Sequence, residues 1–250
     1  MLTKTLKFDD DVLRIIRRMD WLEDGLIGVI NSGQLERDLY VRVNKALEAM
    51  GGKWNRGKKG HVFKIDPRSQ VVGLLDDGLL MVTKDGFFET PLSVVQRMME
   101  LVTPKGMILE PSAGLGAIVD NLGVSKSDIL CIEFNEQRAA KLRENGYKVE
   151  CMDFLEFDLT GFDSIFMNPP FEDGQDIDHV RHAYDCLGKE GAMVSVMSEG
   201  SFFRSDKKAV SFRGWLNSFE DAAYDEKLPE GSFKESGTGV NTRLVAIYKR

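Results

Sequence analysis

The sequence has little cysteine, little histidine and no metal-binding pattern. Its three cysteines, Cys131, Cys151 and Cys186, are odd in number and far apart, so we expect reduced thiols in apolar surroundings and no disulfide framework. His179 and His182 have no acidic or thiol partner at the spacing of metal ligands. The sequence therefore predicts no metal site, with these two histidines on a helix surface.

Long apolar runs are also missing. No stretch of 18 apolar residues is present, and residues 1–7 lack the apolar core of a signal peptide. The chain carries no internal repeat and no low-complexity tract. We therefore expect a soluble, cytoplasmic protein without membrane contact. With 42% hydrophobic residues, the 250-residue chain can bury the core of one large domain, alone or with a small appendage.

Excess basic charge is absent, because the formal net charge is −7. This argues against a protein that coats nucleic acid without specificity. The charge is unevenly distributed: residues 1–80 carry 14 basic against 12 acidic residues, whereas residues 81–250 carry 19 against 28. Residues 40–68 contain 8 basic residues and 2 acidic residues. Basic charge is thus concentrated in one short segment of a predicted N-terminal domain, residues 1–80.

The N-terminal domain has the pattern of a small α+β unit. Apolar residues recur at helical spacing in residues 10–21 and 35–50, and Gly51-Gly52 ends the second helix. Residues 26–30 are typical of a short strand. Residues 53–63 predict a strand, a basic turn and a returning strand.

A helix followed by a basic hairpin can dock on a phosphate backbone, with Trp54 or Phe63 packed beneath it. A solvated hairpin whose aromatic rings form a small core is the alternative. The predicted nucleic-acid contacts in this segment are Lys53, Arg56, Lys58 and Lys59.

From residue 81 onward, strand-like and helix-like segments alternate, which predicts a mainly parallel sheet with helices on both faces. Phe88 precedes Thr90 and Pro91, which we expect to cap and to begin a helix over residues 92–102. A hydroxyl at such a helix start can also help to hold a carboxylate.

The strand predicted over residues 107–110 runs into a glycine-containing turn, and a helix is expected to start at residues 117–121. A strand, a glycine turn and a helix form the first crossover of a nucleotide-binding sheet, where the backbone can approach a ligand closely. The third glycine of the dinucleotide fingerprint is missing, which disfavours a pyrophosphate cofactor. The turn consists of Pro111, Ser112, Ala113, Gly114, Leu115 and Gly116.

Acidic residues stand at three successive strand ends. Glu110 ends the first strand, Glu133 follows strand 129–132, and Asp153 follows strand 148–151. A carboxylate at the place of Glu133 can accept both hydroxyls of a ribose. Asp153 beside an aromatic ring can accept a hydrogen bond from the exocyclic amine of a base. Three acids on one rim of the sheet indicate a nucleoside site better than three unrelated helix caps.

The apolar run 162–167 ends in Asn168-Pro169-Pro170-Phe171. We predict a buried strand that stops abruptly, because proline has no amide donor and cannot extend a ladder. The strand end then presents an amide side chain, a rigid backbone carbonyl and an aromatic face. These groups can accept both protons of a planar amine and cover the attached ring. The motif predicts an adenine receptor; a loop breaker with a packed phenylalanine is the structural alternative.

The C-terminal part adds two weaker candidates. Residues 228–240 predict a long loop, in which Lys234 meets a phosphate or stays solvated. Phe202, Phe203 and Arg204 follow the fifth strand on the same rim and can brace a base. The other elements expected here are helices 176–187 and 209–216 and strands 192–197 and 242–248.

In this order the motifs resemble the S-adenosylmethionine-dependent N6-adenine methyltransferases of the seven-stranded class, above all modification methylases with an Asn-Pro-Pro-Phe motif. The similarity spans about residues 86–250 and implies an α/β fold with a seven-stranded, mainly parallel Rossmann-like sheet. It implies methyl transfer from S-adenosylmethionine to the N6 amine of a flipped adenine in DNA. The residues that it assigns to catalysis are Asn168, Pro169, Pro170 and Phe171. Those that it assigns to the cofactor are Phe88, Thr90, Pro91, Glu110, Pro111, Ser112, Ala113, Gly114, Gly116, Glu133, Phe134, Asp153, Phe154 and Asn168.

The sequence departs from that family in one respect. Adenine methylases of restriction systems carry a large target-recognition region, and nothing large follows the last predicted strand here. Sequence readout is then expected from the N-terminal segment, from a separate specificity subunit or from a homodimer, or it is loose. Three alternatives stay open: an RNA adenine methylase, a protein-glutamine methylase, whose motif has Tyr in place of Phe171, and a non-catalytic nucleic-acid-binding module.

Overall fold

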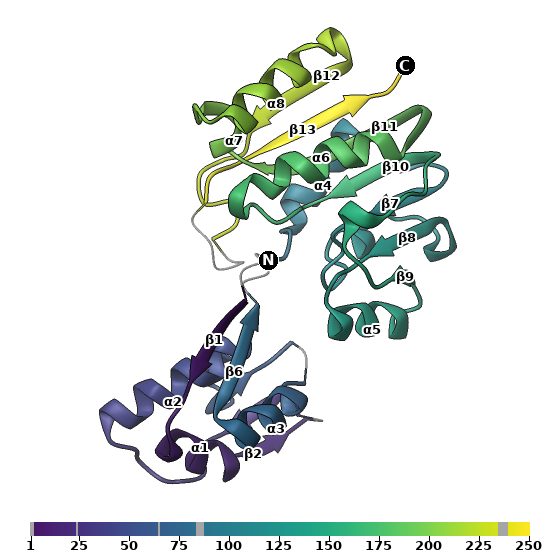
Figure 1. Ribbon diagram of the computed structural model, residues 1–250. Helices are drawn as coiled ribbons and strands as arrows, with labels where there is room; N and C mark the ends of the chain where they lie inside the picture. Colours follow the sequence, from purple (N-terminus) through teal and green to yellow (C-terminus); the bar gives the residue numbers. More distant parts are fainter. Residues whose placement is uncertain (1–2, 24, 65, 84–87, 235–239) are drawn as a thin grey trace. The chain divides into compact units, whose positions relative to one another are not determined.

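The computed structural model describes residues 3–23, 25–64, 66–83, 88–234 and 240–250 (Figure 1). The chain divides into two compact units, Met1–Asp85 and Gly86–Arg250. The boundary suggested by the sequence, between residues 80 and 81, falls inside strand β6 (Leu79–Thr83). That strand pairs antiparallel with β1 (Thr3–Lys7), so it belongs to the first unit.

The first unit combines helices with two antiparallel sheets. One is the β1–β6 pair, and the other has the strand order β2-β3-β5-β4. The remaining elements are α1 (Asp10–Arg17), β2 (Asp20–Leu22), β3 (Ile27–Val29), α2 (Arg37–Ala49), β4 (Lys53–Asn55), β5 (Gly60–Val62) and α3 (Arg68–Asp77).

Local chemistry explains where these helices begin and how they pack. The Asp9 side chain caps α1 by accepting a hydrogen bond from the Val12 N–H at 3.2 Å. The apolar faces of α1, α2 and α3 then meet in one core, in which Val12, Leu47 and Leu74 are fully buried. The first helix is shorter than predicted, because Arg18 leaves the helical conformation and Asp20–Leu22 pairs with β3 instead.

The second unit is built on a seven-stranded mixed sheet with the order β12-β13-β11-β10-β7-β8-β9. Strands β11, β10, β7, β8 and β9 are parallel neighbours, whereas β13 runs antiparallel to both β11 and β12. The strands are β7 (Ile108–Glu110), β8 (Ile129–Ile132), β9 (Lys148–Glu150), β10 (Phe162–Met167), β11 (Leu187–Ser198), β12 (Ala223–Lys227) and β13 (Thr242–Tyr248).

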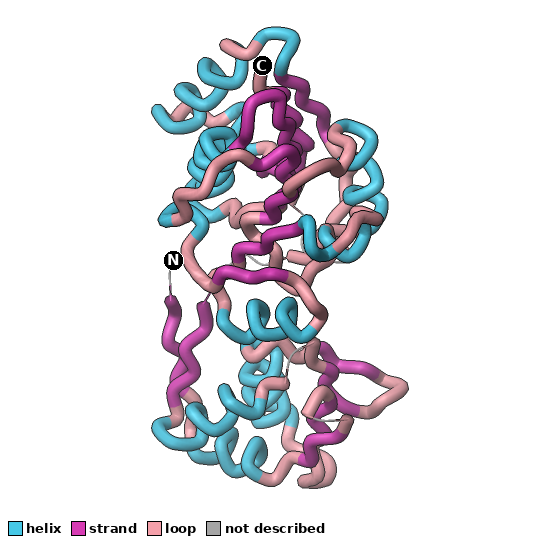
Figure 2. The backbone as a smooth tube through the Cα atoms, turned by 90° about the vertical axis from the view of Figure 1, so that its right-hand side faces the viewer, coloured by secondary structure: helices cyan, strands magenta, loops and turns pink. Residues whose placement is uncertain are grey.

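Helices cover both faces of this sheet (Figure 2). Successive residues of a strand point to opposite faces, and the two cores divide accordingly: Phe166 packs with α4 and α5, whereas Ile165 packs with α6 and α8. The helices are α4 (Leu92–Leu101), α5 (Glu136–Glu144), α6 (Gln175–Cys186), α7 (Gly200–Phe203) and α8 (Lys207–Asn217). The 3-10 turns are η1 (Val119–Asn121), η2 (Lys126–Asp128), η3 (Phe154–Glu156), η4 (Glu172–Gly174) and η5 (Glu220–Ala222).

Several expectations about the second unit were wrong. The helix expected to start at Ala117 is only the short turn η1, and β12 was not foreseen. Cys151 is exposed because it follows β9 at the edge of the sheet, although the other two cysteines are buried.

The two histidines of α6 do not decorate a helix surface, because they lie on its inner face. His179 is buried, and both rings pack against the Phe154 ring, with centroids 5.4 and 4.8 Å away. The His182 Nε2 lies 2.7 Å from the Phe157 carbonyl. Within the ranges described above, no helix combines the length and apolar character of a membrane span.

Candidate active site

Polar groups gather where four parallel strands end. The strands β10, β7, β8 and β9 are consecutive in the sheet, and their carboxyl ends share one edge. Asn168 follows β10, the turn 111–116 follows β7, Glu133 follows β8, and Asp153 follows the edge strand β9. We call this row the polar edge. With strands about 4.8 Å apart, the row from β10 to β9 spans about 14 Å.

The amide of Asn168 is held in one orientation. Its Nδ2 donates to the Phe88 carbonyl and to the Thr90 hydroxyl oxygen, each at 3.1 Å. Both donor positions of the amide are thus used, and Oδ1 accepts from no described residue. Asn168 is half-buried and comes directly after Met167, the last residue of a fully buried strand end. The strand therefore presents a fixed acceptor whose own donors are satisfied.

The two prolines and Phe171 continue from this point as the sequence predicted for the end of a buried strand. Pro169 is buried, and Pro170 is half-buried. Phe171 is also half-buried and packs against the core on the face covered by α4. The backbone then turns through Asp173 (φ 52°) and Gly174 (φ 70°) into α6. The positive φ of Gly174 lies in the region that favours glycine.

The glycine turn is closed by backbone hydrogen bonds. The Ala113 N–H donates to the Ile132 carbonyl at 3.0 Å, and the Gly116 N–H donates to the Ala113 carbonyl at 2.8 Å. Gly114 and Gly116 have φ values of 58° and 93°, in the region that favours glycine. Pro111, Ala113, Gly114 and Gly116 are buried, whereas Ser112 is half-buried.

Glu133 joins this turn to the next strand and helix. Its Oε2 accepts from the Gly114 N–H at 2.7 Å, and its Oε1 accepts from the Asn135 N–H at 2.8 Å. The Arg138 guanidinium donates to the same Oε1 through Nε at 3.0 Å and Nη2 at 2.8 Å. Both residues of this ion pair are buried. Sequence reasoning missed Arg138, although its place in the first turn of a helix that follows an acid was a usable signal.

Glu110 does not face the polar edge in the way that the sequence suggested. Its side chain is only 2% exposed, and its Oε2 accepts from the Val119 N–H at 3.3 Å. Burial raises the pKa of the Glu110 carboxyl well above its ordinary value, although the Val119 N–H acts in the opposite direction. Glu110 therefore holds the turn to η1 from inside the protein.

Asp153 and the aromatic residues also differ from the expectation. The Asp153 carboxylate caps η3 by accepting from the Leu155 N–H at 3.0 Å. Phe154 is only 2% exposed and packs in the core, so its ring offers no face to a ligand. Phe134, next to Glu133, is 50% exposed. The open ring near the acids is thus that of Phe134, and this corrects the role predicted for Phe154.

The predicted cap at the start of α4 was also wrong. Pro91 is the N-cap residue and not the first helical residue, and no side chain caps this helix. Thr90 is buried, and its hydroxyl oxygen accepts from Asn168 instead. The reason is tertiary: β10 ends beside the segment that precedes α4, so the hydroxyl meets an amide donor from another part of the chain.

The weaker candidates on the same edge differ in whether their side chains are exposed or already packed against other residues. Phe203 is 71% exposed, whereas Phe202 packs edge-on against Phe212 with centroids 5.9 Å apart. The Arg204 Nε lies 3.2 Å from the Asp206 carboxylate. Only Phe203 of this group therefore offers an open ring.

The predicted phosphate contacts lie in both units. Lys53, Arg56, Lys58 and Lys59 belong to the β4–β5 hairpin of the first unit and are exposed. The Lys58 Nζ is paired with the Glu23 carboxylate at 2.7 Å.

In the second unit, Lys234 is exposed, and the preceding Phe233 is buried in the core. Residues 235–239 of the predicted loop lie outside the described residues. No group of three or more metal-ligating side chains occurs in the described parts of the chain.

Comparison with known proteins shows the fold. No protein-family model and no curated protein sequence matches the chain. A modification subunit assigned to a type I restriction enzyme of Vibrio vulnificus superposes with a TM-score of 0.55 at 17% identity, over 85% of this chain and 53% of that chain. A type I restriction-modification methyltransferase subunit of Streptococcus thermophilus superposes with a TM-score of 0.56 at 19% identity, over 74% of this chain and 48% of that chain. A structure of a type I restriction-modification assembly superposes with a TM-score of 0.52 at 21% identity, over 64% of this chain and 42% of that chain.

The chain therefore has an α/β methyltransferase-like fold, that of the methyltransferase subunits of type I restriction-modification systems. At these identities the likeness concerns the fold alone. The chain spans about half the length of the structures that it resembles.

Proposed function

We propose that the second unit transfers a methyl group from S-adenosylmethionine to the N6 amine of an adenine that is flipped out of DNA. The observation that carries this proposal is the fixed amide of Asn168. Its two donor positions are used by Phe88 and Thr90, and its Oδ1 accepts from no described residue, so this oxygen is available as an acceptor at a strand end. The carbonyl of Pro169, held by two successive pyrrolidine rings, is the adjacent acceptor.

These acceptors suit a planar amine. The N6 nitrogen of adenine is a poor nucleophile, because its lone pair is delocalised into the ring. Two N–H groups that donate to Oδ1 of Asn168 and to the carbonyl of Pro169 fix the orientation of this nitrogen and favour a tetrahedral geometry. Neither acceptor is a strong base, so they would position the amine and not deprotonate it, and the nitrogen would release one proton to water after it gains the methyl group. Positioning of this kind is worth up to about 7–11 kcal/mol in intramolecular reactions.

The residues of the polar edge fit S-adenosylmethionine. Glu133 Oε2 accepts one hydrogen bond from the described residues, that of the Gly114 N–H, so this oxygen retains capacity for a ribose hydroxyl. The Asp153 Oδ2 has no donor among the described residues and suits an exocyclic amine. The exposed ring of Phe134 lies next to Glu133 in the chain and can cover a base. When bound, the cofactor supplies an electrophilic methyl group on its sulfonium.

The order of these residues along the sheet supports the same arrangement. From β9 to β10 the edge presents an acceptor for a base amine, an acceptor for a ribose, a turn of buried glycines and finally Asn168 with Thr90. An extended nucleoside with an amino-acid chain has its parts in that order. The methyl-bearing end would then lie beside the amine held by Asn168.

DNA is the proposed substrate because the fold is that of type I modification subunits. A base in a duplex cannot reach a strand end, so it must be flipped out at a cost of a few kcal/mol, which stacking on Phe171 partly offsets. Because one of the similar structures is a type I restriction-modification assembly, we propose that sequence readout comes from a separate specificity subunit or from a second copy of the chain.

The direct test is incubation of the full chain with tritiated S-adenosylmethionine and, in separate reactions, duplex DNA, RNA and a protein extract. We expect label in DNA as N6-methyladenine. Asn168→Ala should reduce transfer about a hundredfold to a thousandfold, while calorimetry shows nearly unchanged cofactor binding. Label in RNA or on protein glutamine would replace the substrate proposed here. Absence of cofactor heat from the unaltered protein would identify a non-catalytic module, and full activity of Asn168→Ala would refute the mechanism.

A further inference from the structure

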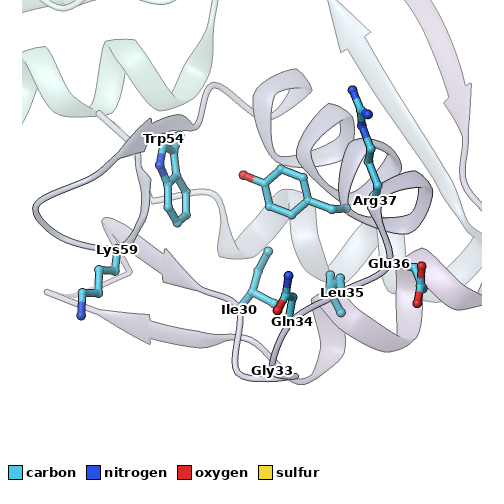
Figure 3. A pocket seen from close by; sticks show the side chains of 9 residues that line it. Ile30, Gly33, Gln34, Leu35, Glu36, Arg37, Trp54 and Lys59 are labelled. Carbon is cyan, nitrogen blue, oxygen red and sulfur yellow. The ribbon is translucent and has the colours of Figure 1, made fainter.

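The first unit contains a groove of about 710 Å³ that the proposed methyl transfer does not use (Figure 3). We call it the Trp54 groove. It lies between the end of β3, the start of α2 and the β4–β5 hairpin. In Figure 3 Trp54 faces the groove from the hairpin side, and Arg37 stands at the start of the helix across from it. The lining residues are Ile30, Gly33, Gln34, Leu35, Glu36, Arg37, Tyr40, Trp54 and Lys59.

Trp54 is an aromatic surface with support beneath it. The indole is 49% exposed, and the ring of His61 meets it edge-on with centroids 5.3 Å apart. His61 is fully buried, and its Nε2 lies 2.7 Å from the Asn44 Oδ1 on α2. The ring below Trp54 is therefore anchored to the helix. Tyr40 adds a second, half-buried aromatic ring to the same groove.

The basic side chains of the groove form no ion pairs with acidic residues that the structure describes. Arg37 and Lys59 are exposed, and neither forms an ion pair with any residue that the structure describes. Lys53 and Arg56 of the same hairpin are alike in this respect. Glu36 is the one acid among the lining residues, and its side chain makes no capping hydrogen bond to α2. The groove thus has unpaired positive charge beside an open aromatic face.

We propose that the Trp54 groove binds an unpaired nucleotide of a single-stranded nucleic acid, with the base stacked on Trp54 and the adjoining phosphates near Arg37 and Lys59. Aromatic stacking surfaces beside cations are typical of sites for single strands, because every base has a π-face. A duplex keeps its base faces stacked inside, so it cannot use the indole. The proposal is independent of methyl transfer, since all these residues belong to the first unit.

The test is fluorescence anisotropy of fluorescein-labelled 12-mers of dT and of U, titrated with the full chain in the absence of S-adenosylmethionine. We expect Trp54→Ala to weaken binding about tenfold, since loss of one stacked base has effects of this size. Trp54→Phe keeps an aromatic face and should retain most of the affinity, which separates stacking from a folding defect. Preference for one of the two 12-mers assigns the strand to DNA or to RNA.

Two matched controls make the result specific. Lys59→Glu and Lys45→Glu change the net charge equally, but Lys45 is exposed on α2 and does not line the groove. We expect only Lys59→Glu to weaken binding severalfold. Asn168→Ala should bind the 12-mers as the unaltered chain does, whatever its activity. Equal losses from both lysine variants, equally tight binding of duplex DNA, or full competition by a polyglutamate peptide would each overturn the proposal.

Discussion

The polar edge of the second unit and the Trp54 groove of the first differ in how their polar groups are held. At the polar edge, Asn168 and Glu133 already have fixed protein partners: two acceptors hold the amide, and Gly114, Asn135 and Arg138 donate to the carboxylate. In the groove, Arg37 and Lys59 are exposed and without such partners in the described chain.

This difference corresponds to two kinds of task. A reaction gains from groups that already have their final orientation, because no reorganisation is then needed at the moment of chemistry. A site for a flexible strand gains from cations that can follow the phosphates and from an aromatic face that accepts any base. The contrast therefore supports catalysis at the polar edge and tolerant binding in the groove.

Removal of a buried partner should have the largest effect. Glu133→Ala leaves the buried guanidinium of Arg138 without its carboxylate, and we expect a loss of about 3–5 kcal/mol in the free energy of unfolding. Urea denaturation of the full chain measures this loss. The matched control is Glu226→Ala, which breaks the more exposed pair with Arg97 and should destabilise the chain much less. Similar losses in the two variants would show that the interactions of Glu133 stabilise the protein no more than those of a more exposed acid.

The orientation of Asn168 is tested by its second acceptor. Thr90→Val removes one of the two bonds to Nδ2 with little change in side-chain volume, and we expect about a hundredfold lower kcat. Because Thr90 acts through Asn168, cofactor affinity and KM should change little, and Thr90→Ser should restore activity. Steady-state kinetics with calorimetry distinguish these quantities. A Thr90→Val enzyme with normal kcat would show that the Phe88 carbonyl alone is enough to orient the Asn168 amide.

His179 is a buried group without the partners that the polar edge provides. Its Nδ1 has no hydrogen-bond partner among the described residues, and burial lowers the pKa of its imidazole to about 4. The unfolded chain takes up a proton below about pH 6.5 and the folded chain only near pH 4. The contribution of His179 to stability should therefore fall as the pH drops through this window, by about 2 kcal/mol at pH 5.

Urea midpoints at pH 7.5 and pH 5.0 measure the contribution of His179. In His179→Gln most of this pH dependence should disappear. His182→Gln is the matched control and should keep it, because His182 already interacts with the Phe157 carbonyl. An unchanged pH dependence in His179→Gln would assign the effect to other groups.

The smallest expected effect compares two neighbouring lysines of the hairpin. Lys59→Gln should lower the slope of log affinity against log salt for a single-stranded 12-mer by about 0.7, the value for one phosphate contact. Lys58→Gln should change it less, because Lys58 is already paired with Glu23. Titrations between low and moderate salt provide both slopes. Equal changes would show that the Glu23 pair does not hold Lys58 in solution.

Much of the sheet was predictable from the sequence. The strands over residues 129–132, 162–167 and 242–248 have the expected bounds, because buried parallel or central strands are short apolar runs with clear ends. The strands β1 and β6 and the helix α3 were missed. Their apolar residues could not be assigned to a sheet from the sequence, because β1 pairs with β6 from the other end of the first unit.

The candidate site was predictable in its position more than in its contacts. Asn168, Glu133 and Asp153 lie at strand ends, as their order along the chain indicated. The roles expected for Glu110, Phe154 and Thr90 were wrong in detail, because each side chain has a partner outside its own strand, turn or helix: Val119, the core beside His179, and Asn168. No local pattern reports such partners.

The sequence by itself determined which chemical groups stand at the ends of the parallel strands, since alternating apolar runs and turn residues define where each strand stops. Only the tertiary structure decided which of these groups remain open to a ligand. That choice depends on donors and acceptors from other segments, such as Gly114 for Glu133 and Thr90 for Asn168. Long-range contacts satisfy some polar groups and leave others available, and function rests on the ones left available.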